Sequence, residues 1–209
     1  MKIISIEGNI GSGKSTFISY LRTHHPEIYI VEEPVHEWAT VMDNTGVGIL
    51  EKFYNDQHTY AFPFQILAYV SRFTTFRKLM KLPDIENKII VTERCLHSDK
   101  HIFAKMLHDS GKINDINYQV YCKMFTEFSD DYPIHKLFYV RTDAELCLTR
   151  IRERDRNGEC EISSEYLFEC DKYHEDMVQS YGSSISIVDG NPTRTDAMYE
   201  TWFDEMVKN

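Results

Sequence analysis

Eight residues near the start of the chain have the types and the spacing of a phosphate-binding loop. The segment from Gly8 to Ser15 reads G-N-I-G-S-G-K-S and fits the pattern G-x-x-x-x-G-K-[ST]. Successive glycines let backbone N–H groups turn inward around phosphate oxygens. Lys14 can then reach the β- and γ-phosphates of a nucleotide, and the Ser15 hydroxyl can ligate Mg²⁺. The motif predicts nucleotide binding, against the alternative of a chance glycine-rich turn, and does not by itself identify an acceptor.

Carboxylates follow two apolar runs of β type. The first run, at residues 28–31, is followed by Glu33 and Pro34. Proline cannot donate a hydrogen bond to a neighbouring strand, so the strand must end before Pro34, and Glu33 is expected at the edge of the sheet. Glu93 and Arg94 follow the run Ile89-Ile90-Val91. A nucleotide-phosphate site needs an acid there to hold Mg²⁺ or its waters, and an arginine beside it can neutralise phosphate. Either acid also fits a solvated turn, and for Glu33 the spacing alone does not decide.

A run of arginines forms a third candidate group, at residues 150–162. Arginine alternates with other residues at four positions, Arg150, Arg152, Arg154 and Arg156, and Glu159 follows the pair Asn157-Gly158. On a helix the first and third of these arginines share one face and the second and fourth share another, until the Asn-Gly pair breaks the helix. The rigid, always-charged guanidinium suits a transferred phosphoryl group, which favours a lid. The alternative is a salt-bridged surface helix, because acidic residues interleave.

The elements that must position these groups alternate along the chain. Strands are expected at 2–6, 28–31, 88–92, 136–140 and 185–188. Helices are expected at 14–22, 62–80 (with Pro63 in its first turn), 96–108, 113–128, from 144, at 163–181 and from 195. This alternation predicts an α/β fold, a five-stranded parallel sheet with helices on both faces, in a single domain spanning residues 1–209. Ligands of such sheets bind beyond the carboxyl ends of the strands, where the candidate residues fall.

Composition limits the partners. A net charge of −10 over 209 residues argues against a nucleic-acid partner. The five cysteines form no CxxC pair, which favours reduced thiols over a zinc site. There is no apolar run long enough to span a membrane and no signal or transit peptide, so we expect a cytoplasmic protein, in the host cytoplasm if the chain is viral.

Together these segments resemble the deoxyribonucleoside kinases of the deoxycytidine, deoxyguanosine and mitochondrial thymidine kinase type, from about residue 2 to 191. The loop from Ile6 to Thr16 is similar to that family's loop at almost every position. The shorter likenesses are Glu33-Pro34-Val35 with Trp38, Gly46-Val47 with Leu50-Glu51 and Tyr54, Phe64-Gln65, Glu93-Arg94 with Ser98-Asp99, Arg150 to Arg156 with Glu159, and Tyr166-Leu167. Cys95 departs from the family's serine but removes no expected ligand.

The resemblance implies a P-loop kinase fold with an arginine-rich lid. It implies transfer of the γ-phosphate of ATP, with Mg²⁺, to the 5′-hydroxyl of a deoxyribonucleoside. Implied catalytic residues are Glu33 as general base, Arg94 and Lys14; implied metal ligands are Ser15 and Glu93. The implied nucleoside-binding residues are Glu33, Trp38, Tyr54, Gln65, Arg72, Arg94, Asp99 and Glu159. The implied phosphate-binding residues are Gly8, Asn9, Ile10, Gly11, Ser12, Gly13, Lys14, Ser15, Thr16, Arg152, Arg154 and Arg156.

The resemblance also implies a homodimer packed through helices. The segments 62–80 and 113–128 are long enough to supply that face, although their apolar residues fit a plain core equally well. Three other functions compete with the nucleoside kinase. A monophosphate kinase of the thymidylate kinase type shares the loop and the acid-Arg pair. A GTP-driven switch lacks its N-K-x-D signature here, and an ATP-driven nucleic-acid motor conflicts with the negative charge.

Three polar residues bear on which base is accepted. Gln65 can make a bidentate contact with a base edge. Arg72 lies seven residues later on the same helix face, and Asp99 can hydrogen-bond either to Arg72 or to an exocyclic amine. In the family, Arg and Asp at these positions accompany deoxycytidine and purine acceptors, so we expect those to be preferred over thymidine. The alternative is that Arg72 and Asp99 form only a structural ion pair.

Overall fold

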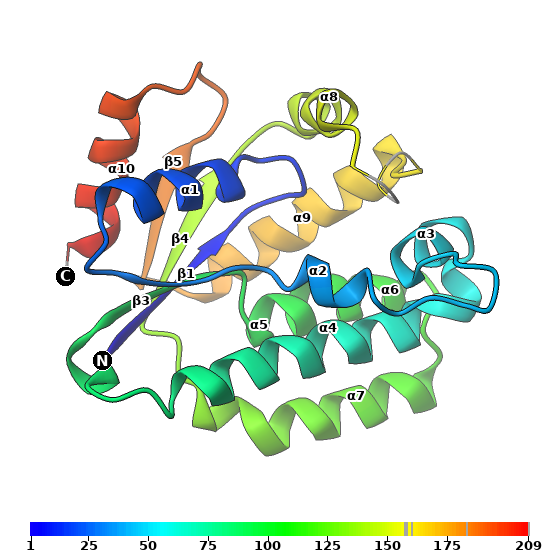
Figure 1. Ribbon diagram of the computed structural model, residues 1–209. Helices are drawn as coiled ribbons and strands as arrows, with labels where there is room; N and C mark the ends of the chain where they lie inside the picture. Colours follow the sequence, from blue (N-terminus) through cyan, green and yellow to red (C-terminus); the bar gives the residue numbers. More distant parts are fainter. Residues whose placement is uncertain (157–158, 160, 183, 209) are drawn as a thin grey trace.

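The computed structural model describes residues 1–156, 159, 161–182 and 184–208. Five parallel strands form one sheet in the order β2-β3-β1-β4-β5, which confirms the predicted α/β fold (Figure 1). Their bounds are β1 Lys2–Glu7, β2 Tyr29–Val31, β3 Ile89–Glu93, β4 Lys136–Arg141 and β5 Ile185–Asp189. The α-helices are α1 Lys14–His24, α2 Val35–Trp38, α3 Ile49–Asn55, α4 Gln57–Leu79, α5 Leu96–Ser98, α6 Lys105–Asp109, α7 Asp115–Phe128, α8 Ala144–Arg154, α9 Ser164–Ser180 and α10 Asp196–Val207.

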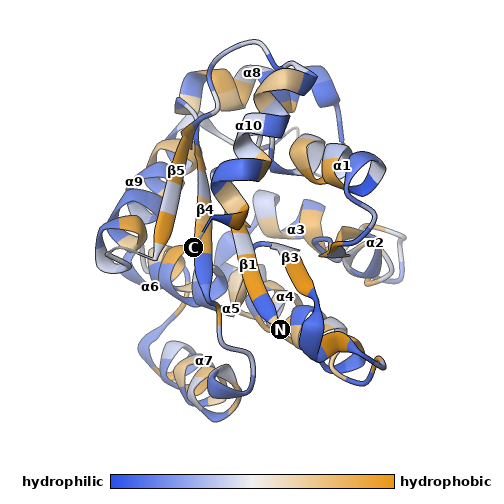
Figure 2. Ribbon diagram, turned by 90° about the vertical axis from the view of Figure 1, so that its left-hand side faces the viewer, coloured by the Kyte–Doolittle hydropathy of each residue, from blue (hydrophilic) through white to orange (hydrophobic). Residues whose placement is uncertain are grey.

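Alternating side chains of β1 face opposite sides of the sheet. Ile4 and Ile6 pack with Phe17 of α1 and Trp202 of α10. Ile3 points the other way and belongs to a cluster built mainly by α4 and α7. The sheet is therefore covered on both faces, and apolar residues line the inner sides of the helices (Figure 2). No helix of the described part of the chain is both long and apolar enough to cross a membrane.

Two helices differ from the prediction. α4 begins at Gln57, because the side chain of Asp56 caps it by accepting from the Thr59 N–H. Pro63 therefore lies inside α4, and its expected place in the first turn is wrong. The segment expected as one regular helix at 96–108 contains a π-helix, η2, from Asp99 to Ala104 between α5 and α6. Such turns carry one extra residue and often sit at functional sites.

The strand register brings the candidate residues to one edge of the sheet. β1 lies between β3 and β4, and Ile6 pairs with Glu93. The loop after β1 therefore neighbours the Glu93-Arg94 turn after β3. β2 pairs with β3 on its other side, so the Glu33 turn reaches the same edge. The chain order reverses around β1, which is where open α/β sheets bind ligands.

Candidate active site

The phosphate-binding loop has the backbone that its glycines permit. Gly11 and Gly13 have φ angles of 80° and 104°, values that residues with a side chain rarely adopt. A Cβ atom on Gly11 would lie 2.5 Å from the Cys147 carbonyl oxygen. α1 begins directly after Gly13, so its N-terminal N–H groups and positive dipole end face the loop. This arrangement can hold the phosphates of a nucleotide.

Lys14 is folded back onto the loop that it follows. Its Nζ donates to the carbonyl oxygens of Gly8 and Asn9, at 3.0 and 2.8 Å. Burial, together with the positive charge of Arg94, lowers the pKa of Lys14 to about 8. A phosphate group in the loop would offer this cation a better partner than two neutral carbonyls.

Ser15 and Glu93 meet where a divalent cation would sit. The Ser15 hydroxyl donates to Glu93 Oε1 at 2.7 Å. A hydroxyl and a carboxylate are hard oxygen donors that suit Mg²⁺, which usually keeps several waters and takes few protein ligands. The two residues therefore fit a Mg²⁺ site. Among the described residues there is no cluster of three or more acidic, His or Cys side chains able to hold a metal alone.

Glu33 stands among three cations. Its Oε1 lies 3.2 Å from Arg94 Nε and 3.5 Å from Arg72 Nη2. Burial raises the pKa of Glu33, but Arg94, Arg72 and Lys14 outweigh it, and the pKa ends below its ordinary value. The carboxylate is therefore ionised at neutral pH. Its side chain stays 20% exposed, so it can still meet a substrate.

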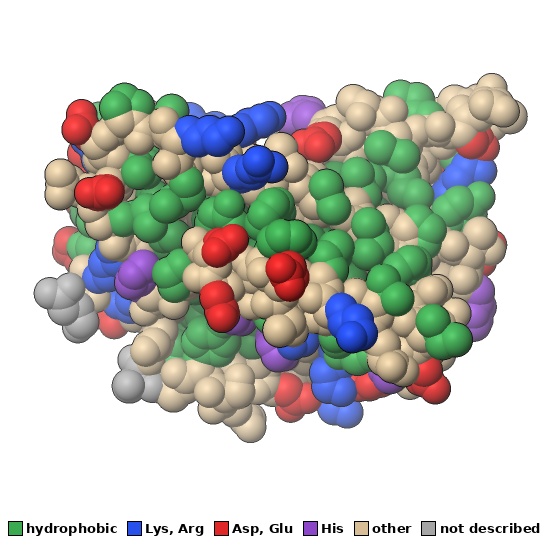
Figure 3. Space-filling view, turned by 90° about the horizontal axis from the view of Figure 1, so that it is seen from below, with side chains coloured by type: hydrophobic (Ala, Val, Ile, Leu, Met, Phe, Trp, Pro, Cys, Tyr) green, Lys and Arg blue, Asp and Glu red, His purple; other side chains and the backbone are tan. Residues whose placement is uncertain are grey.

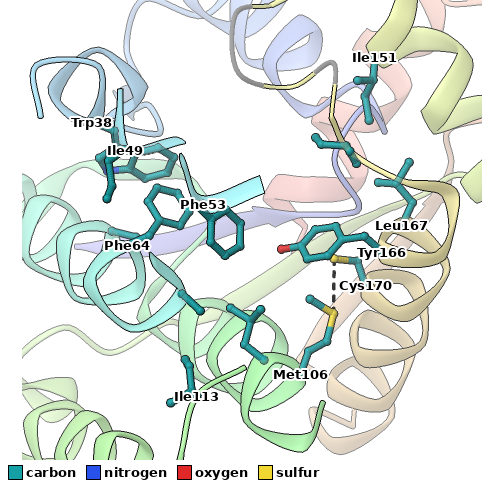
Figure 4. Packing of buried hydrophobic residues seen from close by; sticks show 14 of the residues in the cluster. Trp38, Ile49, Phe53, Phe64, Met106, Ile113, Ile151, Tyr166, Leu167 and Cys170 are labelled. Carbon is teal, nitrogen blue, oxygen red and sulfur yellow. Dashed lines mark hydrogen bonds between the residues drawn. The ribbon is translucent and has the colours of Figure 1, made fainter. Parts of the chain in front are cut away.

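A single cavity of about 350 Å³ connects the phosphate loop to an aromatic chamber. Trp38 donates from Nε1 to Ser71 Oγ and packs edge-on against Phe64. Phe53 stacks on Phe64, and the hydroxyl end of Tyr166 points toward Phe53 (Figure 4). The lining includes Lys14, Ser15, Glu33, Trp38, Tyr54, Gln65, Glu93, Arg94, Asp99, Arg154, Arg156 and Glu159. Of the charged residues expected in the site, all but Arg72 and Arg152 line this cavity.

Arg72 supports this chamber from behind. It is buried, does not line the cavity, and holds Asp99 through two hydrogen bonds, Nε to Oδ2 at 2.8 Å and Nη2 to Oδ1 at 3.2 Å. Its Nη1 donates to the Glu93 carbonyl oxygen at 2.6 Å. Asp99, the first residue of η2, is thereby fixed at the cavity wall.

The lid departs from the prediction in one respect. α8 ends at Arg154, with Asp155 in a left-handed conformation, so the expected helix break at Asn157-Gly158 is wrong and Arg156 lies beyond the helix. Asn157, Gly158 and Cys160 lie outside the described residues. Arg154 and Arg156 both form ion pairs with Glu159. Arg152 is exposed and does not line the cavity.

Cys95 lies below the loop, away from the cavity lining. It is fully buried, and its Sγ donates to Glu7 Oε1 at 3.2 Å. The Ser98 hydroxyl also donates to this oxygen, and Ser5 does so at 2.6 Å. Burial raises the pKa of Cys95 above its usual value, which makes the thiol unreactive at neutral pH. Cys95 therefore takes the place of the family's serine as a residue that packs in the interior and donates a hydrogen bond.

The sequence alone did not lead to Arg194. Its Nη2 donates to the Ser12 carbonyl oxygen at 3.1 Å, its Nη1 to Thr16 Oγ1 at 3.4 Å, and it lines the cavity. Arg150 is close by and donates to the Gly190 carbonyl oxygen at 3.0 Å. The sequence did hold one signal for Arg194, namely a cation that follows shortly after the last expected strand, at the same edge of the sheet.

Comparison with known proteins agrees with this geometry. Residues 4–208 match the family model described as deoxynucleoside kinase. Deoxycytidine kinase 1 of Xenopus laevis is 33% identical over 193 residues, covering 84% of this chain and 73% of the relative. A probable deoxycytidine kinase of fowlpox virus is 36% identical over 170 residues, covering 79% and 67%. A putative kinase of invertebrate iridescent virus 3 is 31% identical over 189 residues, covering 90% and 88%. The chain therefore belongs to the deoxynucleoside kinase family.

Proposed function

We propose that this chain transfers the γ-phosphate of ATP to the 5′-hydroxyl of a deoxyribonucleoside. The observation that carries the proposal is the single cavity that joins the phosphate loop to the aromatic chamber, with Glu33 and Arg94 in its lining. Its volume of about 350 Å³ falls within the usual range for small-molecule sites. The curated relatives named deoxycytidine kinase support a nucleoside as the acceptor.

The donor side is assigned to the loop and the lid. Backbone N–H groups of the loop and Lys14 hold the β- and γ-phosphates. Ser15 and Glu93 hold Mg²⁺, which when bound neutralises charge on the phosphates. Arg154 and Arg156 exchange their ion pairs with Glu159 for oxygens of the transferred group as the lid closes. Glu159 is then released toward the sugar.

On the acceptor side, Glu33 is assigned as the general base. The 5′-hydroxyl donates its proton to a Glu33 oxygen as its own oxygen bonds to the γ-phosphorus and the bond from that phosphorus to ADP breaks. A low carboxylate pKa makes a weak base, but phosphoryl transfer has a loose transition state that needs little proton abstraction early on. Positioning of the hydroxyl by Glu33 and charge stabilisation by Arg94 contribute the larger share.

The base is assigned to the chamber between Trp38 and Gln65. Gln65 and Asp99 form its polar wall, and Arg72 holds Asp99 in place from behind. Arg72 and Asp99 are 2% and 3% exposed, so the pair is rigid and desolvated. The 5-methyl group of thymine would meet this charged wall and leave its polar groups imperfectly paired. We therefore propose that deoxycytidine and the purine deoxyribonucleosides are preferred over thymidine.

Replacement of both members of the pair tests this preference. We expect Arg72→Met with Asp99→Ala to raise thymidine use relative to deoxycytidine, measured as the ratio of kcat/KM values, by about tenfold or more. The wild-type protein should favour deoxycytidine, deoxyadenosine or deoxyguanosine in the same assay. If the wild-type protein prefers thymidine to all three, the proposed role of the polar wall is wrong even though the kinase assignment stands.

We also propose a homodimer formed through α4 and α7. These helices pack against each other and carry exposed apolar side chains, Val70 on α4 and Ile116 and Val120 one turn apart on α7. Figure 3 shows hydrophobic side chains spread over the face of the molecule seen from below. Burial of such a face in a symmetric interface explains why it is tolerated.

Light scattering after size-exclusion chromatography tests the dimer. We expect about twice the chain mass of 24.7 kDa for the wild-type protein, and the monomer mass after Ile116→Glu with Val120→Glu. Phe168→Glu on α9 is the control, because Phe168 is exposed to a similar extent but lies on another helix. A monomeric wild-type protein at micromolar concentration contradicts the proposal.

A further inference from the structure

The Arg94 side chain is held in one orientation by groups on three sides. Its backbone has a φ of 63°, a left-handed conformation that is costly for a residue with a side chain. Its Nη1 donates to the Gly8 carbonyl oxygen at 2.9 Å and lies 3.2 Å from Nε2 of His174. The guanidinium carbon lies 4.7 Å from the centre of the Phe103 ring. Both hydrogens of Nη1 are thus engaged, whereas Nη2 has no hydrogen bond to the described part of the chain and can serve an oxygen of the substrate.

The tautomer of His174 follows from its second contact. Its Nδ1 lies 2.6 Å from the Cys170 carbonyl oxygen, one helical turn earlier on α9. A carbonyl oxygen only accepts hydrogen bonds, so Nδ1 carries the proton. Nε2 then presents its lone pair and accepts from Arg94 Nη1. A doubly protonated ring would direct an N–H group at the guanidinium, which is unfavourable between two buried cations.

The surroundings of His174 keep its imidazole ring neutral and fixed. His174 is completely buried, is stacked on Tyr139 at 6.0 Å, and has Phe103 edge-on at 6.1 Å. Burial, and next the charge of Arg94, keep the pKa of His174 well below its ordinary value. Most histidines that are neutral in solution carry the proton on Nε2, so the Nδ1–H form is imposed by the fold.

We infer that His174 is a positioning residue, which aims the Arg94 guanidinium at the transferred phosphoryl group. His174 does not line the cavity; besides Arg94, its ring also interacts with the Gly8 backbone of the phosphate loop. The inference rests on the proposed role of Arg94 in phosphoryl transfer. It adds a second requirement to that role, namely an acceptor on α9 that fixes the plane of the guanidinium.

Two substitutions of matched length separate positioning from packing. His174→Gln places an amide oxygen near the position of Nε2, whereas His174→Met fills similar space without a good acceptor. We expect His174→Met to lower kcat about 10- to 100-fold, since a small misplacement of a catalytic group has effects of this size. His174→Gln should stay within about threefold of wild type, and KM for the nucleoside should change little in both. Equal kcat values in the two variants, each corrected for folded fraction by thermal melting, would overturn the inference.

The same pair in an Arg94→Lys background shows whether the effect passes through Arg94. We expect the two His174 variants to differ little there, because lysine lacks the Nη1 group that His174 holds. If the two His174 variants still differ in kcat by the same factor in the Arg94→Lys background, the inference is overturned. Nitrogen-15 NMR of labelled histidine provides a check independent of activity, with the Nδ1–H tautomer expected at pH 7. An Nε2–H or a charged ring would also overturn it. Failure of the wild-type protein to phosphorylate any nucleoside would instead refute the proposed function.

Discussion

Replacement of Glu33 by glutamine lowers kcat by about 10²- to 10⁴-fold while the deoxyribonucleoside still binds, if Glu33 is the general base. Glutamine keeps the size of the side chain and an oxygen that can accept from Arg94 Nε, now at 3.2 Å. It cannot take up the proton of the 5′-hydroxyl, and its neutral amide holds that hydroxyl less firmly than the carboxylate does. Steady-state kinetics with ATP and Mg²⁺, together with calorimetric titration of the nucleoside, measure the two effects separately.

Glu32→Gln is the matched control for this substitution. Glu32 is the preceding residue, but it pairs with Arg22 at the surface, and its side chain is 50% exposed. We expect its kcat to stay close to that of the wild-type protein. Activity of Glu33→Gln within threefold of wild type, or an equal loss in both variants, removes the assignment of Glu33.

The second large effect concerns the lid. We expect Arg154→Ala to lower kcat by about 10²- to 10³-fold with little change in the nucleoside dissociation constant, because charge that develops on the transferred group loses a fixed cation. Arg156→Ala should behave similarly. Both residues line the cavity, and each contacts Glu159 in the structure. Single-turnover kinetics isolate the transfer step from product release.

Arg152→Ala provides the control for the lid. Arg152 lies on α8 with Arg154, is exposed, and is absent from the cavity lining. In contrast to the phosphate-binding role implied by the resemblance, we therefore expect Arg152→Ala to change kcat by less than about threefold. If Arg154→Ala keeps full turnover and loses nucleoside affinity instead, Arg154 belongs to the acceptor side.

The strands and the phosphate loop were predictable from the sequence because each depends on a short, local pattern. The apolar runs expected as strands at 2–6, 28–31 and 88–92 marked the sheet edge, and the observed strands end within one residue of them, at Glu7, Val31 and Glu93. The glycine spacing marked a backbone that most other residues cannot adopt. Resemblance to a family added Trp38 and Gln65, whose roles no local pattern indicates.

Features set by contacts distant in sequence were not predictable in this way. The π-helix begins at Asp99, whose side chain is held by Arg72, 27 residues earlier. The end of α8 at Arg154 depends on a left-handed Asp155, whereas the sequence pointed to the nearby Asn-Gly pair. Arg194 and His174 reach the site through contacts with Ser12 and Arg94, over 182 and 80 residues of sequence. Such contacts become visible only once the sheet is assembled.

Transfer from ATP to a nucleoside rather than to a nucleotide is the central claim, and isotope labelling tests it most directly. ATP labelled with ¹⁸O in the γ-phosphoryl group is incubated with Mg²⁺ and the purified protein, with deoxycytidine in one reaction and dCMP in another. The products are weighed by mass spectrometry. We expect labelled dCMP from deoxycytidine and no labelled dCDP from dCMP. Labelled dCDP from dCMP, with deoxycytidine left unphosphorylated, would contradict the claim and identify a monophosphate kinase.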